Sequence, residues 1–218
     1  MKDNKAPSES KDLRDYYSVI ERVFTRWASF YDLVVSPIKS VRNRIVNLSG
    51  AKPGDKVLDV ATGTGKQAFA FAKSGCDVIG IDITEGMLRV ARKHNTYKNL
   101  SFRQADATSL PFQDNTFDIT SIAFALHEMP SVVREKALLE MVRVTMPDGV
   151  IIISDYGLPG NRLWRFFVYH FVKAYEGNYY PEFAKSDITA FIRQAGISIQ
   201  IIQAAACHIG VIIKGQKI

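Results

Sequence analysis

A strand, a glycine turn and a helix start follow one another in residues 57–66, and this order constrains the fold more than any other feature. The segment reads VLDVATGTGK, with an acid, Asp59, in the apolar run and a turn through Gly63 and Gly65. Glycine tolerates positive φ and lets the backbone approach a ligand, and free N–H groups at a helix start attract negative charge. We therefore expect a nucleotide-type site whose ligand also carries a cation near Asp59, as a nucleoside with an amino-acid tail does.

Polar side chains recur where the strands of the predicted sheet end. The expected strands cover residues 56–60, 77–81, 100–104 and 117–123, and Asp59, Asp82, Asp106 and His127 stand at or just beyond their ends. Asp82 follows Gly63 by 19 residues, the separation at which an acid in a βαβ unit binds ribose hydroxyls. Ligands of open α/β sheets bind outside the carboxyl ends of the strands, so these side chains predict one site.

The remaining pattern alternates helices and strands. Helices are expected over residues 65–74, 85–94 and 131–145, and a fifth strand over 149–155. Near the C-terminus, Ile197 to Ile202 and Cys207 to Lys214 are β-rich, and the four residues between them are too few for a parallel crossover. These features predict an α/β, Rossmann-like doubly wound sheet, mostly parallel with one antiparallel strand near the C-terminus.

The N-terminal part differs in composition from the rest. Residues 1–11 are polar and predicted to be a disordered tail, and residues 12–50 form a helical segment with helices within 13–30 and 38–48. We expect residues 51–218 to be the ligand-binding domain.

Composition excludes several classes of protein. The net charge is only +6 and the basic residues are mixed with acids, which is not the basic face of a nucleic-acid-binding protein. No apolar run approaches the roughly 20 residues of a membrane span and no signal peptide is visible. We therefore expect a cytoplasmic protein without a transmembrane segment, with peripheral membrane contact left open. Neither Cys76 and Cys207 nor the four histidines have metal-ligand spacing, so no metal is expected.

Taken together, the ordered motifs resemble those of class I S-adenosylmethionine-dependent methyltransferases over roughly residues 19–157. Within that class the chain is most similar to the ubiquinone/menaquinone-biosynthesis C-methyltransferases. The matching stretches are ASFYD at 28–32, VLD at 57–59, GTG at 63–65, DI at 82–83, GML at 86–88, DA at 106–107, LPF at 110–112, DNTFD at 114–118, AFAL at 123–126 and PDG at 147–149. Where those enzymes usually have an Arg-Asn pair after the fourth strand, this chain has His127-Glu128.

The resemblance implies S-adenosyl-L-methionine as cofactor. Asp59 would bind its ammonium group, Asp82 its ribose hydroxyls, and Asp106 with Ala107 its adenine; the plainer alternatives are a turn carboxylate and surface acids. The other expected cofactor-binding residues are Ala61, Thr62, Gly63, Thr64 and Gly65 in the glycine turn, Ile83 and Met87 against the adenine, Ala123 and Phe124 near the sulfonium, and Tyr31 as a cover.

The methyl acceptor is expected to be small and apolar or aromatic, as a quinol is. His127 is the candidate general base because it follows the fourth strand, although a structural role fits it equally. Six aromatic residues lie in 163–175 and point around the whole helix, which predicts a buried helix. The resemblance implies a substrate lid at about 158–185, whereas core packing or a homodimer interface explains the same residues. The candidate substrate-binding residues are Trp27, Trp164, Tyr169, His170 and Tyr175.

Two other functions stay open at this level. A non-catalytic protein that binds S-adenosylmethionine and regulates a partner would need the same cofactor site. An NAD(P)-dependent oxidoreductase is the third candidate, because residues 63–68 also fit the dinucleotide fingerprint and Asp82 fits its ribose acid. Against it, Asp59 would repel a pyrophosphate in the mouth of the site, and the C-terminal hairpin fits that topology poorly.

Overall fold

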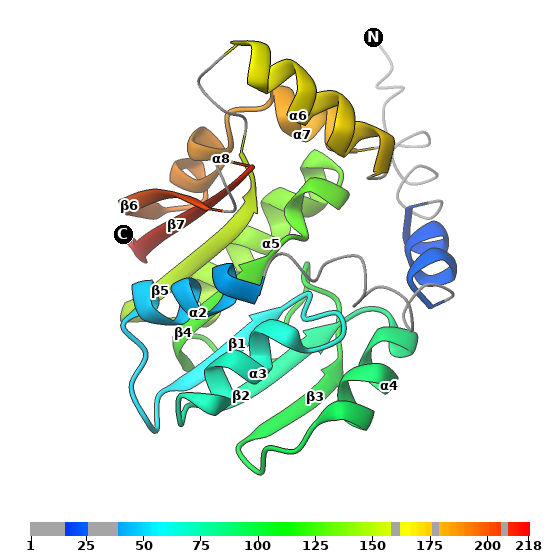
Figure 1. Cartoon of the computed structure of the whole chain (residues 1–218). Helices are drawn as coiled ribbons and strands as arrows, with labels where there is room; N and C mark the ends of the chain where they lie inside the picture. Colours follow the sequence, from blue (N-terminus) through cyan, green and yellow to red (C-terminus); the bar gives the residue numbers. More distant parts are fainter. Residues whose placement is uncertain (1–15, 26–38, 158–161, 176–178, 206–208) are drawn as a thin grey trace, which may run out of the picture.

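A twisted sheet with helices on both faces forms the centre of the molecule (Figure 1). The computed structural model describes residues 16–25, 39–157, 162–175, 179–205 and 209–218. Within these residues the sheet has seven strands in the order β3-β2-β1-β4-β5-β7-β6. The strands are β1 (Lys56–Val60), β2 (Asp77–Asp82), β3 (Leu100–Gln104), β4 (Phe117–Ala123), β5 (Thr145–Tyr156), β6 (Ile197–Ala205) and β7 (Gly210–Lys217).

The helices surround this sheet in chain order. A helix over residues 16–25 precedes the first labelled one. The others are α2 (Lys39–Ser49), α3 (Lys66–Lys73), α4 (Glu85–His94), the 3-10 turn η2 (Leu126–Glu128), α5 (Ser131–Val144), α6 (Arg162–Tyr175), α7 (Tyr180–Lys185) and α8 (Ile188–Gln194).

The strand directions confirm the fold expected from the sequence. The pairs β1–β2, β2–β3, β1–β4 and β4–β5 are parallel, whereas β7 is antiparallel to both of its neighbours, β5 and β6. The short link between β6 and β7 leaves no room for a crossover, so the last strand must run backwards.

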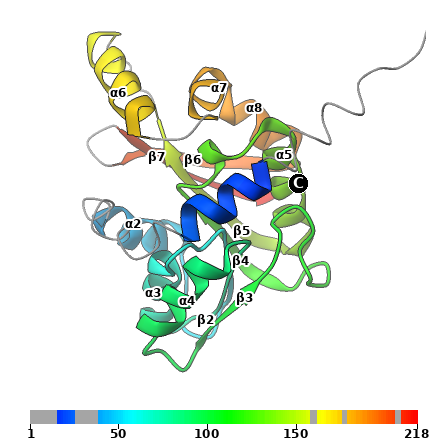
Figure 2. The same ribbon diagram turned by 90° about the vertical axis from the view of Figure 1, so that its right-hand side faces the viewer.

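Alternate side chains of β1 build two separate cores. Val57 belongs to a cluster that includes Ile45 of α2 and Phe71 of α3. The next residue, Leu58, belongs to a second cluster that includes Leu138 of α5. Successive side chains of a strand point to opposite faces, so a strand buried on both faces reads as a continuous apolar run. Figure 2 shows the helices on both sides of the sheet.

The junction between α5 and β5 differs from the expectation. The helix was expected to reach residue 145 and the strand to begin at 149, but α5 ends at Val144 and β5 begins at Thr145. The Thr145 hydroxyl lies 2.6 Å from the Met141 carbonyl and 2.9 Å from the Thr120 hydroxyl. These buried contacts tie Thr145 into the sheet opposite Phe117, so pairing starts before the PDG turn.

Helix α6 is not buried all round, which corrects the expectation drawn from its aromatic residues. Val168 and Val172, one turn apart, are buried, whereas Leu163 is 69% and Phe166 58% exposed. The helix contacts α7 and lies at the outer end of the molecule (Figure 1). One face therefore packs inward and the other carries exposed apolar side chains.

Gly65 is where the glycine turn meets α3, and it is expected to resist substitution. Its φ is +81°, and an added Cβ would lie 2.6 Å from Cζ of Phe102. We expect Gly65→Ala to lower the free energy of unfolding by about 3 kcal/mol, from backbone strain plus overpacking. Gly50→Ala is the matched control, because Gly50 has a φ of +75° and nothing within 4 Å of the added Cβ. Equal losses in urea unfolding of the two variants would contradict the packing argument.

Candidate active site

Two adjoining cavities lie at the carboxyl ends of the parallel strands. They enclose about 740 and 580 Å³, counting the open space at their mouths, which is the range of small-molecule sites. The larger cavity is lined by Tyr16, Tyr17, Ile20, Phe24, Ala61, Gly63, Ile81, Asp82, Ile83, Thr84, Met87, Ala105, Asp106, Ala107, Phe124, Ala125, Glu128, Met129 and Val133. The smaller cavity is lined by Arg42, Ile45, Asp59, Ala61, Thr62, Gly63, Thr64, Lys66, Gln67, Ala123 and Phe124.

The residues that line both cavities have unusual backbone conformations. Ala61, Gly63 and Phe124 have φ values of 52°, 54° and 53°, a region that residues other than glycine rarely adopt. The sheet holds them there: the Thr62 N–H donates to the Ile81 carbonyl at 2.8 Å, and the Phe124 N–H to the Ser154 carbonyl at 2.7 Å. Strained residues of this kind cluster at ligand sites, so the junction of the cavities is where a ligand is expected.

Asp59 presents a buried carboxylate to the smaller cavity. It lies on β1 between Gly80 and Ser121 of the neighbouring strands and is 1% exposed. Its Oδ2 accepts a hydrogen bond from the Thr62 hydroxyl at 2.6 Å, while Oδ1 has no hydrogen-bond partner among the described residues. Burial raises the pKa of Asp59 to about 7, against the lowering effect of the Thr62 hydrogen bond. A bound cation would compensate this burial.

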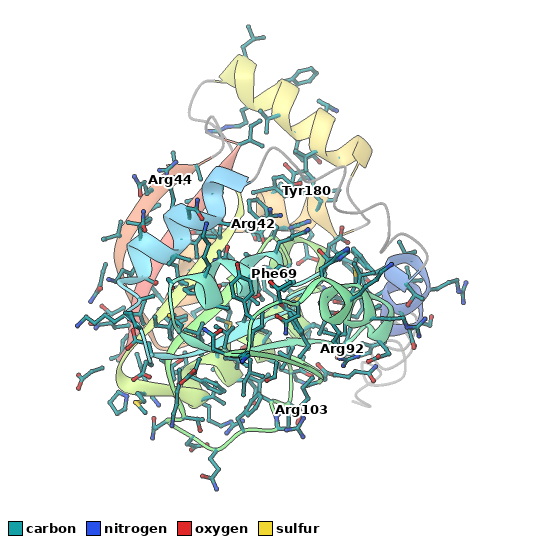
Figure 3. The ribbon with its side chains drawn as sticks, turned by 60° about the horizontal axis from the view of Figure 1, so that its bottom comes forward. Arg42, Arg44, Phe69, Arg92, Arg103 and Tyr180 are labelled. Atoms are coloured by element: carbon teal, nitrogen blue, oxygen red, sulfur yellow. The ribbon has the colours of Figure 1, made fainter. Side chains whose placement is uncertain are left out.

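Basic side chains face the same smaller cavity. Arg42 comes from α2, as Figure 3 shows, and Lys66 from the first turn of α3. An acid and two bases around one cavity suit a zwitterionic group such as a free amino acid, whose ammonium and carboxylate need opposite partners. Sequence reasoning did not find Arg42, because nothing in the sequence indicates that α2 packs beside the glycine turn.

Asp82 joins the end of β2 to the glycine turn. Its Oδ2 accepts a hydrogen bond from the Gly63 N–H at 2.8 Å and its Oδ1 from the Thr84 N–H at 2.9 Å. Burial raises the pKa of Asp82, and the Thr84 and Gly63 hydrogen bonds lower it. The separation of 19 residues therefore corresponds to a direct contact. Each carboxylate oxygen keeps a lone pair with which it can accept a ligand hydroxyl.

The far end of the larger cavity is closed by the helix over residues 16–25. Tyr16, Tyr17, Ile20 and Phe24 of this helix line it, opposite Asp106. Burial raises the pKa of Tyr17, whose hydroxyl interacts with the side chains of Thr108 and Asp106. The cover expected from Tyr31 lies outside the described residues, as does Trp27. Other N-terminal aromatic residues thus cover the site in the described part of the chain.

His127 lies one layer behind the larger cavity. It is 3% exposed, and its Nδ1 is 2.7 Å from Oδ1 of Asp155 at the end of β5. Asp155 also accepts hydrogen bonds from the backbone N–H groups of His127, at 3.3 Å, and Tyr156, at 2.7 Å. Because a carboxylate only accepts hydrogen bonds, Nδ1 carries the proton. Sequence reasoning missed Asp155, although it is one more acid at a strand end.

Aromatic rings enclose the imidazole of His127. The ring centroid of Tyr156 lies 4.7 Å away, that of Phe183 6.2 Å and that of Tyr180 6.5 Å. Tyr180, on α7, lies beneath α6 in Figure 3. His127 lines neither cavity, whereas Glu128 beside it lines the larger one. The group that faces the ligand space is therefore the carboxylate next to the histidine.

The cavities bring together most of the side chains that the sequence singled out. Among the expected cofactor-binding residues, Asp59, Ala61, Thr62, Gly63, Thr64, Asp82, Ile83, Met87, Asp106, Ala107, Ala123 and Phe124 all line one or both. Gly65 lies beneath them against Phe102.

The expected substrate-binding residues are not gathered there. Tyr169 packs on Tyr180 with ring centroids 5.9 Å apart, and His170 packs on Phe166 at 4.3 Å; neither lines a cavity. The side chains of Trp164 and Tyr175 lie outside the described part of α6.

Searches for two other kinds of site were negative in the described ranges. These residues contain no group of three or more His, Cys, Asp or Glu side chains that could hold a metal ion. None of their helices has the length and apolar character needed to cross a membrane.

Comparison with known proteins identifies relatives of the central part of the chain. Residues 57–149 match the family of methyltransferase domains. A demethylmenaquinone methyltransferase of Renibacterium salmoninarum is 41% identical over 118 residues, which are 54% of this chain and 48% of that protein. A ubiquinone/menaquinone biosynthesis C-methyltransferase of Ectopseudomonas mendocina is 38% identical over 157 residues, 66% of this chain and 60% of that protein.

Solved structures extend the likeness in fold. An S-adenosylmethionine-dependent methyltransferase of Aquifex aeolicus superposes with a TM-score of 0.66 at 22% identity, over 81% of this chain and 89% of that one. The chain spans about half to three fifths of the length of the two curated relatives named above.

Proposed function

Because this chain belongs to the S-adenosylmethionine-dependent methyltransferases, we propose that it methylates a small apolar or aromatic acceptor of the quinol type. The cofactor of the family is S-adenosyl-L-methionine, which supplies a methyl group already activated on a sulfonium. Positioning of the acceptor then provides most of the catalysis. The observation that carries the proposal is the buried Asp59 carboxylate, whose Oδ1 lacks a partner in the described structure.

The residues around both cavities fit this cofactor. In our proposal, Asp59 binds the ammonium group and Arg42 with Lys66 the carboxylate, in the smaller cavity. Asp82 accepts the ribose hydroxyls at the junction. Asp106 and Ala107 bind the adenine edge in the larger cavity, between the side chains of Ile83 and Met87.

Two observations support an apolar or aromatic acceptor. The part of the larger cavity beside Phe124 is lined by Met129 and Val133, which are apolar. The curated relatives named above are quinone-biosynthesis methyltransferases. We further propose that residues 158–185 form the lid; α7 within that range packs on η2, which follows the fourth strand. The exposed Leu163 and Phe166 of α6 support a contact with a homodimer partner or a membrane surface.

The test of this function is methyl transfer to a reduced quinone. The purified chain is mixed anaerobically with S-adenosylmethionine and a demethylmenaquinol that carries a short prenyl chain, and the products are identified by mass spectrometry. We expect a methylated product from the quinol and none from the oxidised quinone, which lacks the nucleophilic hydroxyl groups. Binding of the cofactor without turnover of any quinol or phenol would instead favour a non-catalytic regulator.

Substitution of Asp82 tests its proposed contact with the ribose. Asp82→Ala is expected to weaken binding of S-adenosylhomocysteine by about 2 kcal/mol, because it removes charge-assisted hydrogen bonds and releases the Gly63 turn. Asp77→Ala, at the exposed start of the same strand, serves as the control and should bind normally. Isothermal titration calorimetry measures both, and an unchanged affinity for Asp82→Ala would refute the assignment.

A further inference from the structure

We infer that Glu128 is the group that accepts the proton of the methyl acceptor, and that His127 and Asp155 position and relieve it. The inference rests on the proposed function, because quinols and phenols become good nucleophiles only when a hydroxyl proton is removed. It replaces the expectation that His127 itself touches the acceptor. Glu128 is thus the catalytic candidate, and the other two are positioning residues.

Glu128 is placed to meet an acceptor. It lines the larger cavity together with Phe124, Ala125 and Met129, at the end remote from the adenine residues. Its side chain is 17% exposed, so it combines access to the cavity with partial shielding from water. Burial is the main cause that raises the pKa of Tyr16, and the charges of Tyr17 and Glu128 add to it. Glu128 therefore also faces the helix that covers the site.

The imidazole behind Glu128 has a fixed orientation. Asp155 binds Nδ1–H at 2.7 Å, which leaves Nε2 as the nitrogen on the opposite side of the ring. Nε2 lies 3.8 Å from Oε1 of Glu128. This separation is slightly beyond a hydrogen bond, and a small rotation of the carboxyl group after it takes up a proton closes it. The three side chains thus form an ordered row from the core to the cavity.

Other charged and titratable groups surround this row. Arg134 of α5 donates to the carbonyls of Leu126 and Met129, which flank the pair at both ends of η2. The groups that face it from the packed elements are Tyr16 of the N-terminal helix, Arg134 of α5, Asp155 and Tyr156 of β5, and Tyr180 and Glu182 of α7.

The proposed step moves one proton in two transfers. The O–H bond of the acceptor breaks, its electron pair stays on the acceptor oxygen, and the proton binds an Oε of Glu128. A second transfer carries the proton from Glu128 to Nε2 of His127, which becomes an imidazolium paired with Asp155. The Glu128 carboxylate is then restored, and the acceptor oxygen, or a ring carbon conjugated to it, is the nucleophile.

The experiment combines turnover with an NMR measurement that needs no acceptor. With the short-chain demethylmenaquinol as the probe, Glu128→Gln should lower kcat about 100-fold or more. It should also flatten the acid limb of the pH profile and leave the Kd for S-adenosylhomocysteine within about threefold. Glu128→Asp should keep part of the activity. Glu135→Gln, an exposed glutamate of α5, is the matched control and should behave as the parent protein.

In the same proteins with ¹⁵N-labelled histidine, the His127 ring is assigned through His127→Gln and titrated. We expect Nδ1 to carry the proton, and the titration midpoint to fall in Glu128→Gln because a neighbouring carboxylate has been removed. Activity within threefold of the parent in Glu128→Gln, or an unchanged midpoint, would overturn the inference. If the parent protein methylates no quinol, the proposed function fails, and the NMR titration alone decides whether Glu128 and His127 are coupled.

Discussion

Replacing Asp59 by asparagine is expected to weaken binding of S-adenosylhomocysteine by about 2–3 kcal/mol, the range for loss of a buried charged hydrogen bond. That ligand keeps the ammonium group that we assign to Asp59. Because asparagine is almost isosteric, the fold and the Thr62 contact should survive the change. Calorimetric titration of both proteins gives the difference, with Asp148→Asn as an exposed control that should bind normally.

The same substitution is expected to remove a pH dependence. Burial raises the pKa of Asp59 to about 7 in the free protein, so below that pH the carboxyl group must lose a proton before it pairs with an ammonium. Affinity should therefore fall as the pH falls below about 7, by up to about tenfold per unit. Asp59→Asn should show no such fall. A parent affinity that stays flat between pH 5 and pH 8, conditions chosen roughly around that pKa, would contradict the assignment.

Replacing Arg134 by methionine is expected to lower the free energy of unfolding by about 3–5 kcal/mol, the range for disruption of a buried charged contact. Arg134 is fully buried. Its Nε donates to the Leu126 carbonyl at 3.1 Å and its Nη2 to the Met129 carbonyl at 2.9 Å. Its guanidinium also lies 5.0 Å from the ring centroid of Phe183. Methionine fills similar space but leaves both carbonyls without these donors.

The matched control is Arg103→Met. Arg103 also lies over an aromatic ring, 5.8 Å from the centroid of Phe112, but it is exposed. Its loss should lower stability by only about 0.5–1 kcal/mol, as for exposed cation–π pairs. Urea unfolding of both variants decides the matter. Similar losses at the two positions would show that the buried hydrogen bonds of Arg134 contribute little.

The sheet could be predicted from sequence because its signals are local. β1 reads as a continuous apolar run next to a glycine turn, and the bounds expected for β1, β3 and β4 agree with the structure. Asp82 could be matched to Gly63 because a βαβ unit fixes their separation. The start of β5 could not be predicted, because Thr145 joins the sheet through Thr120, which is distant in sequence.

The rest of the site depends on contacts between distant segments. Arg42 reaches the smaller cavity only because α2 packs beside α3, and Tyr17 reaches Asp106 only because the N-terminal helix crosses the larger one. The pairing of His127 with Asp155 joins the ends of two neighbouring strands. Hydrophobic periodicity carries no information about which helix covers which strand end, so these residues had no signal of their own.

Calorimetric titration of the purified protein with S-adenosylhomocysteine, with NADH as the parallel ligand, tests the central claim most directly. Both ligands carry an adenosine, but only the first has the amino-acid group that Asp59, Arg42 and Lys66 are proposed to bind. We predict micromolar binding of S-adenosylhomocysteine, a binding free energy of about −8 kcal/mol, and no heat from NADH. Binding of NADH instead, with none of S-adenosylhomocysteine, would mean that the glycine turn holds a dinucleotide and that the role assigned to Asp59 is wrong.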